Sequence, residues 1–211
     1  MYTLKTPENN RIYLEGVVKG LVTESTRLKE IYEVVDFSIG GLPISAEELE
    51  TLKSLEDPAN LDYEMSIPEL AYARNLKRFG DVMIPPPSYT DFLKYCDLED
   101  IKVHPIDMDD DHFTMAYCKH VSGANWIMQS FREKRLLKKD ISGDSPKDFA
   151  LEWDTVINKL KGYRALEEHR EEVMGKNIRR LSKGGDIFSI IEYERLDGVL
   201  KILTSANCTI F

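Results

Sequence analysis

The chain of 211 residues predicts an α/β protein with a largely parallel sheet flanked by helices. Short segments rich in β-branched and aromatic residues alternate with longer segments of helical periodicity, which is typical of parallel sheets. Glycine and proline residues separate many of these segments. Hydrophobic residues make up 42% of the chain and charged residues 31%, as in an ordinary globular domain. We therefore expect residues 1–211 to form a single α/β domain.

Five segments are predicted to be strands of this sheet. Residues 12–18 are rich in β-branched and aromatic side chains, and residues 187–191 form an apolar run after Gly184 and Gly185. Between them, strands are predicted over residues 34–39, 81–84 and 101–106. Three consecutive prolines halt the second of these, and Pro105 counts against a central position for the third.

Capping sequences and helical periodicity predict the helices. Two capping boxes, Ser45 with Glu48 and Ser66 with Glu69, each open a helix. The clearest linker spans residues 140–148, and another helix begins inside it. Periodic apolar positions predict helices over residues 24–34 and 164–181, and a helical turn over residues 91–95.

Residues 112–163 contain much helix and no obvious strand. One helix is expected to begin within residues 107–121 and to continue past Gly123 to Lys139. We therefore expect this region to be a helical insertion in the domain, or a cap over the sheet.

The charge balance argues against nucleic-acid binding as the main function. The formal net charge is −9 and the isoelectric point is near 5.1, whereas binding to phosphates usually needs a basic face. The local basic run is interpreted as a solvated helix face, and it comprises Arg132, Lys134, Arg135, Lys138 and Lys139.

Cysteine use and hydropathy predict the compartment. Cys96, Cys118 and Cys208 form neither a metal-type pair nor an even disulfide set, which favours a reducing environment. The first eleven residues are polar and lack the apolar core of a signal peptide. No window approaches 18 consecutive apolar residues, so no membrane span is expected. These observations predict a cytoplasmic protein.

Candidate site residues follow the predicted strands, because ligands of open parallel sheets bind beyond the carboxyl ends of the strands. Lys19 follows the first strand, and Asp107 and Asp109 follow residues 101–106. The last strand leads into Glu192, Glu194 and Arg195. These side chains would meet only if the strands that carry them are neighbours.

The acidic run from Asp107 to His112 offers hard oxygen ligands for a divalent cation. It lacks the glycine and the glutamate that an EF-hand loop needs at its sixth and twelfth positions. We interpret it as an aspartate N-cap with further acids in the first helical turn, where they oppose the helix dipole. The four histidines show no metal-binding spacing, and no nucleophile elbow, P-loop or dinucleotide-binding motif is present. No metal and no cofactor are expected.

Three segments of the chain carry a family resemblance. They are "IYLEGVVKGLVTESTRLKEIYEVVDFSIGGLPISAEEL", "EEHREEVMGKNIRRL" and "DIFSIIEYERLDGVLKIL". In order and spacing they resemble the TraB/PrgY (pheromone-shutdown) group, which belongs with the erythromycin-esterase and ChaN-like proteins. The resemblance covers residues 11–202. It implies an opening strand with a histidine-containing turn, a late helix with a conserved arginine, and a final strand followed by a Gly-x-Gly-His turn.

The departures from the family pattern concern its histidines. The first family histidine falls on Lys19, and the final Gly-x-Gly-His falls on residues 192–195, with Arg195 in the place of the imidazole. Arg170 and Gly198 match the family. Members with metalloprotease-like activity are thought to use these histidines together with nearby acids. The resemblance therefore implies that this chain has lost the imidazoles that a zinc-like or manganese-like site would need.

Three hypotheses of function stay open at the level of sequence. In the first, Lys19, Glu192, Glu194 and Arg195 form a structural ion-pair cluster that closes the old pocket, and the chain is a non-catalytic scaffold with a regulatory or interaction role. In the second, the chain is a hydrolase that uses Asp107, Glu192 or Glu194, either with a bound cation or as acid and base.

In the third hypothesis the chain is an anion-binding module centred on Lys19, Arg170 and Arg195, because cations form charge-assisted hydrogen bonds to anionic ligands. The expected partners are accordingly a second copy of the chain, as a homodimer, or a small anionic ligand. Neither nucleic acid nor a membrane is expected as a partner.

Overall fold

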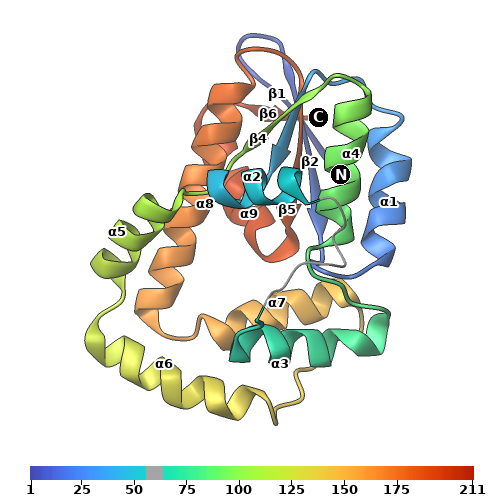
Figure 1. Cartoon of the computed structure of the whole chain (residues 1–211). Helices are drawn as coiled ribbons and strands as arrows, with labels where there is room; N and C mark the ends of the chain where they lie inside the picture. Colours follow the sequence, from blue (N-terminus) through green and yellow to red (C-terminus); the bar gives the residue numbers. More distant parts are fainter. Residues whose placement is uncertain (56–63) are drawn as a thin grey trace.

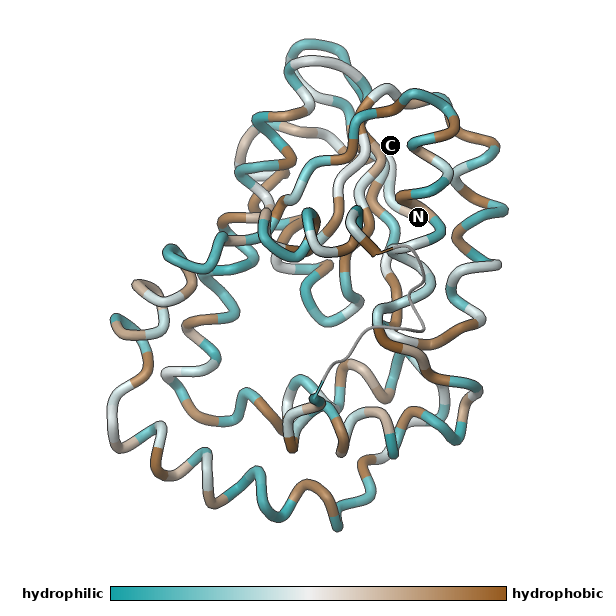
Figure 2. The backbone as a smooth tube through the Cα atoms, in the orientation of Figure 1, coloured by the Kyte–Doolittle hydropathy of each residue, from teal (hydrophilic) through white to brown (hydrophobic). Residues whose placement is uncertain are grey.

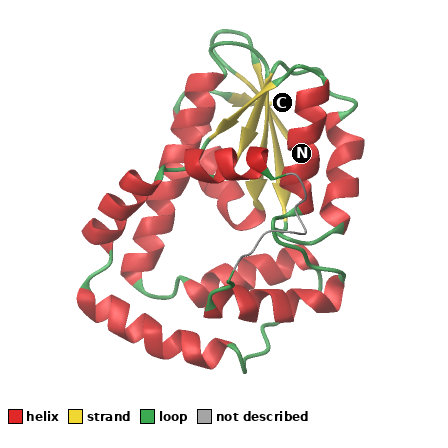
Figure 3. Cartoon of the chain, viewed as in Figure 1, coloured by secondary structure: helices red, strands yellow, loops and turns green. Residues whose placement is uncertain are grey.

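The computed structural model describes residues 1–55 and 64–211 and contains a six-stranded sheet between layers of helices (Figures 1 and 3). In chain order the strands are β1 (Tyr2–Lys5), β2 (Arg11–Val17), β3 (Ile39–Leu42), β4 (Lys102–Pro105), β5 (Ile187–Glu192) and β6 (Thr209–Ile210). Their spatial order is β4-β3-β5-β2-β1-β6. The strands from β4 to β2 are parallel, and β1 and β6 are antiparallel to their neighbours. The predicted α/β class with a largely parallel sheet is confirmed.

The helices connect and cover these strands. In chain order they are α1 (Thr23–Tyr32), α2 (Ala46–Ser54), α3 (Ile67–Leu76), α4 (Pro87–Leu98), α5 (Asp110–His120), α6 (Gly123–Leu136), α7 (Pro146–Ile157), α8 (Lys161–Leu181) and α9 (Tyr193–Ser205). A short 3-10 helix, Lys77–Phe79, extends α3. Hydrophobic and hydrophilic residues alternate along most helices, as amphipathic helices require (Figure 2). Within the described part of the chain, no helix combines the length and apolar composition needed to cross a membrane.

The strand β5 organises the core, because both of its faces are covered. Ile187 and Ile191 pack on one face with side chains from α8 and α9. Phe188 and Ile190 pack on the opposite face with side chains from α1 and α4. Successive side chains of a strand point to opposite faces, so a continuous apolar run is what a strand covered on both faces requires.

Helices α3, α6 and α7 form a cap beyond the carboxyl ends of the parallel strands (Figure 1). The cap has its own apolar cluster, in which Leu76, Leu136, Phe149 and Trp153 are buried, and Val18 at the end of β2 joins this cluster to the sheet. Residues 112–163 contribute α6 and α7, but α3 comes from an earlier part of the chain. The cap is therefore assembled from two separate segments.

Two predicted strands are wrong. The segment 34–39 does not form a strand, because α1 ends at Tyr32 and β3 begins only at Ile39. Gly40 and Gly41 follow the predicted strand but lie inside β3. Neighbouring side chains leave little room for larger residues there: a Cβ on Gly40 would come within 3.1 Å of Val103, and one on Gly41 within 3.2 Å of Ser189 Cβ. The segment 81–84 contributes only an isolated bridge between Val82 and Leu21.

The predicted turn after the last strand is also wrong. Glu192 ends β5 and Tyr193 begins α9 without an intervening loop. Two further differences concern length: the turn expected at 91–95 is part of the longer α4, and the helix expected to run through Gly123 is divided into α5 and α6 at Val121–Ser122.

Candidate functional site

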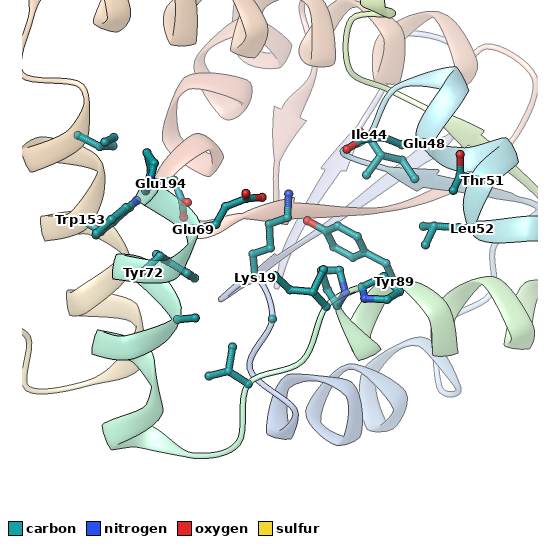
Figure 4. A pocket seen from close by; sticks show the side chains of 18 of the residues that line it. Lys19, Ile44, Glu48, Thr51, Leu52, Glu69, Tyr72, Tyr89, Trp153 and Glu194 are labelled. Carbon is teal, nitrogen blue, oxygen red and sulfur yellow. The ribbon is translucent and has the colours of Figure 1, made fainter. Parts of the chain in front are cut away.

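A pocket lies where the parallel strands end and the cap begins (Figure 4). Its volume is about 480 Å³, which falls within the range of small-molecule sites. The segments after β2 and β3 supply Lys19 and Ile44, and Glu194 comes from the first turn of α9. Helices α2, α3 and α7 close its sides. The position agrees with the general rule that open parallel sheets bind ligands beyond the carboxyl ends of their strands.

The sheet register brings Lys19 and Glu192 together. β2 pairs with β5 in parallel, with Val17 opposite Glu192. Lys19 Nζ is 3.9 Å from Glu192 Oε1, and the Tyr89 hydroxyl donates a hydrogen bond of 3.2 Å to the same oxygen. Burial and the nearby charge of Glu192 raise the pKa of Tyr89 well above its ordinary value, so this hydroxyl remains a donor. Glu192 is thus a buried carboxylate held from two sides.

Glu194 is two residues further along and lies in a different environment. Its Oε2 atom is buried and has no hydrogen-bond partner among the described residues. Burial, with the negative charge of Glu192 as the second cause, raises the pKa of Glu194 to about 8. The carboxyl group therefore keeps its proton at neutral pH. Glu192, the other carboxyl group at this strand end, has contacts to Tyr89 and Lys19 that Glu194 Oε2 lacks. Acid–base sites place two carboxyl groups in unlike surroundings in this way.

Tyr72 from α3 lies beside Glu194 and Trp153 in the pocket wall (Figure 4). Its hydroxyl is also buried without a hydrogen-bond partner in the described part of the chain. Burial and the charges of Glu194 and Glu192 raise the pKa of Tyr72 well above its ordinary value, so the hydroxyl is a donor. A buried polar group without a partner is costly, so a bound molecule that reached both the Tyr72 and Glu194 oxygens would gain their unmade hydrogen bonds.

The remaining lining is acidic and apolar. Lys19 is the only lysine or arginine among the described residues that line the pocket. The lining carboxyl groups are Glu47, Glu48, Glu69, Asp110 and Glu194. The apolar lining residues include Leu52, Val82, Ile84, Pro85, Pro86, Trp153 and Ile157.

Arg170 and Arg195 belong to an ion network beside the pocket. Arg195 is 5% exposed; its guanidinium lies 2.9 Å from Glu171 and 3.4 Å from Glu167, and it also contacts Asp154. Burial lowers the pKa of Arg195 to about 10, so the group keeps its charge at neutral pH.

Arg170 and Arg195 contact the same oxygen of Glu167, Oε2, which lies 2.8 Å from the Arg170 guanidinium. The Nε of Arg170 also donates a hydrogen bond of 3.0 Å to Asp107. The network thus joins α7, α8, α9 and the segment after β4. Neither arginine is among the described residues that line the pocket, and both already hold carboxylates.

The acidic run after β4 caps a helix. Asp109 is the N-cap of α5 and accepts a hydrogen bond of 2.8 Å from the His112 backbone N–H, as predicted. Asp107 is bound by Arg170 and borders a second cavity of about 510 Å³ between α5 and α8. Nowhere in the described residues do three His, Cys, Asp or Glu side chains gather as a metal site requires.

The candidate residues therefore divide between two places. Lys19 and Glu194 line the strand-end pocket, and Glu192 lies buried beside it against Lys19 and Tyr89. Asp107, Arg170 and Arg195 meet in the ion network. Sequence reasoning missed Tyr72, Tyr89 and Glu48, which enter the pocket from helices. Only tertiary packing brings those helices to the strand ends. No local motif marks Tyr72 or Tyr89, and the motif that contains Glu48 is a capping box, which predicts a helix start and no site.

Comparison with protein-family models finds no match, and comparison with curated proteins finds no similar sequence. The resemblance to the TraB/PrgY group therefore stays a prediction.

Proposed function

We propose that this chain is an enzyme that performs acid–base hydrolysis on a small organic molecule bound in the strand-end pocket. Glu194 is the proton donor and Glu192 is the proton acceptor. This proposal rests on one observation, the pair of carboxyl groups of Glu192 and Glu194 at the end of β5. Two carboxyl groups stand at one strand end, and the pKa of Glu194 is raised to about 8 by burial and by the charge of Glu192.

The chemistry of such a pair follows from its protonation. A neutral Glu194 can give its proton to the leaving atom of a substrate, while the Glu192 carboxylate takes a proton from the attacking water. Water then adds across the cleaved bond, and the proton taken by Glu192 balances the one that Glu194 has given. Lys19 and Tyr89, both near Glu192 Oε1, hold this carboxylate in position.

The walls of the pocket support the same role. Tyr72 and Trp153 lie beside Glu194 and provide apolar surface that excludes water from it, and Pro85 and Pro86 of the α3–α4 connection add further apolar lining to the pocket. Water exclusion keeps the pKa of Glu194 raised and strengthens the electrostatic interactions within the pocket. Perturbed carboxyl groups in a cleft are a recognised signature of catalytic sites.

A second candidate function is a non-catalytic binding protein that uses the same pocket. One observation favours it: Glu192 Oε1 already accepts a hydrogen bond from Tyr89 and lies 3.9 Å from Lys19. Both contacts occupy the oxygen with which Glu192 would accept a proton from water.

The test is a screen of hydrolysable chromogenic esters, amides, phosphates and glycosides with the wild-type chain, E192Q and E194Q. Glu30→Gln is the matched control, because Glu30 is exposed and lies outside the pocket. We expect turnover by the wild type and the control, and a loss of at least about 100-fold in kcat in each site variant. Turnover that survives in both E192Q and E194Q would overturn the catalytic proposal. A ligand that binds in the pocket and stays intact would favour the second candidate.

A further inference from the structure

We infer that the molecule taken by the strand-end pocket is an organic cation, with an ammonium or guanidinium group on an apolar and partly aromatic body. This inference rests on the proposed function, because it names the class of substrate for that same site. Three independent features of the pocket support it: its charge, its walls and its unpartnered buried oxygens.

The charge of the lining favours a cation. Carboxyl groups enter the pocket from four different helices: Glu47 and Glu48 from α2, Glu69 from α3, Asp110 from α5 and Glu194 from α9. The single basic side chain among the described lining residues, Lys19, already has Glu192 at 3.9 Å. Negative charge on several sides of a partly enclosed cleft attracts cations and repels anions.

The walls suit the body of such a molecule. Leu52, Ile84 and Ile157 are apolar, and Tyr72 and Trp153 contribute aromatic rings. A cation over an aromatic face gains further attraction from the ring quadrupole, and the effect is strongest over tryptophan. The volume of about 480 Å³ admits one small molecule of this kind.

Two buried oxygens indicate where the charged group of the ligand binds. Glu194 Oε2 and the Tyr72 hydroxyl are buried without a hydrogen-bond partner among the described residues, and the side chains that carry them line the pocket near Trp153 (Figure 4). A charged nitrogen at this point would donate to Glu194 and lower its pKa, because a neighbouring cation favours the charged form of a carboxyl group. In a substrate the Glu194 proton then passes to the leaving atom, as the proposed function requires. An amine without a cleavable bond cannot take this proton, so its binding releases the proton to solvent near neutral pH.

The experiment compares three ligands that share one body: phenylpropylamine, phenylpropanol and phenylpropanoate. Affinities are measured by isothermal titration calorimetry with the full chain at low ionic strength. We expect the amine to bind at least about ten-fold more tightly than the alcohol and the acid, which corresponds to about 1.4 kcal/mol. Calorimetry of the amine in two buffers of different ionisation enthalpy should also show proton release.

Three variants locate the effect. Glu194→Gln should reduce the preference for the amine and abolish the proton release. Lys19→Gln removes the opposing positive charge, so it should strengthen amine binding, and Glu30→Gln should change neither. Thermal unfolding and circular dichroism confirm that each variant is folded.

The outcomes separate this inference from the proposed function. If the alcohol or the acid binds as tightly as the amine, the pocket takes small molecules but the inference of a cation is overturned. If none of the three ligands binds, the inference is overturned, and the proposed function loses its ligand-binding pocket as well. Amine binding that Glu194→Gln leaves unchanged would place the cation elsewhere and overturn the inference.

Discussion

Glu192 and Glu194 share one strand end but differ in what surrounds their carboxyl groups. Glu192 receives a hydrogen bond from Tyr89 and lies near Lys19, whereas one oxygen of Glu194 has no partner among the described residues. Burial, with the charge of Glu192 as the second cause, raises the pKa of Glu194 to about 8, so the Glu194 carboxyl group keeps its proton at neutral pH.

Replacing Glu194 by glutamine should alter the pH dependence of stability. The ordinary pKa of 4.5 describes the unfolded chain, whereas the native group titrates at about 8. Between these values the native state binds more protons than the unfolded state, so the free energy of unfolding falls as pH rises. E194Q removes this contribution. Urea unfolding at about pH 5 and about pH 8 should show a smaller loss of stability in E194Q than in the wild type.

Other groups do not confound this comparison. Burial and the charge of Glu167 raise the pKa of Glu171 to about 7, which acts in the same direction, but that contribution is present in both proteins. Equal pH dependence in the wild type and E194Q would show that Glu194 ionises normally in the native state.

At the residue scale the sequence predicts only part of the pocket. Lys19, Glu192 and Glu194 could be found because each follows a strand of the parallel sheet, and the carboxyl ends of such strands share one edge. Tyr72 and Tyr89 could not, since α3 and α4 reach this edge through packing of residues far apart in the chain. Nor could the sequence separate Arg195 from Glu194, because the first turn of α9 directs these neighbouring side chains to different places.

Arg195 connects three helices. It comes from α9 and contacts Asp154 from α7 and both Glu167 and Glu171 from α8. Only one further cation, Arg170, shares the network, through Glu167 and Asp107, among the described residues. A buried arginine among several carboxylates is costly to remove, because the carboxylates then lack compensation.

Substitution of Arg195 by alanine should destabilise the protein by about 3–5 kcal/mol in chemical unfolding at neutral pH. The control is Arg180→Ala, since Arg180 is exposed near the end of α8 and should change stability by less than about 0.5 kcal/mol. A loss below about 1 kcal/mol for Arg195→Ala would mean that the network does not hold α7, α8 and α9 together.

Among the secondary-structure elements, α9 has a clear apolar periodicity in the sequence, but its start directly after β5 was not recognised. Leu196, Val199, Leu200 and Leu203 recur at helical spacing and are buried, so the periodicity of the helix was readable. The family resemblance instead implied a turn over residues 192–195. In the structure these residues are the end of β5 and the first turn of α9. Glu192 and Arg195 are buried there, so protein groups surround their charges in place of water. The short strands β1 and β6 carry too few residues for a clear pattern.

The cap gives the pocket its outer wall, and Phe149 is central to the cap. Phe149 is fully buried and its ring lies 5.3 Å from that of Tyr72 and 6.3 Å from that of Trp153. These two neighbours line the pocket. The cap core and the pocket wall are therefore one packed unit.

Phe149→Ala should destabilise the protein by about 3–5 kcal/mol, because it leaves a cavity in the cap core. Hydrogen exchange should show lost protection concentrated in α3 and α7, with smaller changes in β2 and β5. Phe131→Ala is the matched control, since Phe131 in α6 is 64% exposed and its loss should be nearly neutral. Uniform loss of protection across cap and sheet would contradict an independent cap core.

At the scale of the whole molecule, the alternation of strands and helices was enough to predict the class and a largely parallel sheet, but not that β2 pairs with β5. The strand order and the two-segment origin of the cap were not predictable, because they depend on which apolar faces meet in three dimensions. The strand boundary near Gly40 and Gly41 was predicted wrongly for the same reason. Both glycines lie inside β3 because side chains of β4, β5 and α4 leave little room for a Cβ there.

The most direct measurement is a titration of the Glu194 side-chain carboxyl carbon by nuclear magnetic resonance, with E194Q used to assign the signal. We expect a midpoint near pH 8, well above the ordinary 4.5 of a glutamate, and a downward shift of that midpoint when phenylpropylamine is added. A midpoint close to 4.5 in the free protein would contradict the protonated, solvent-excluded carboxyl on which the pocket's acid–base chemistry depends.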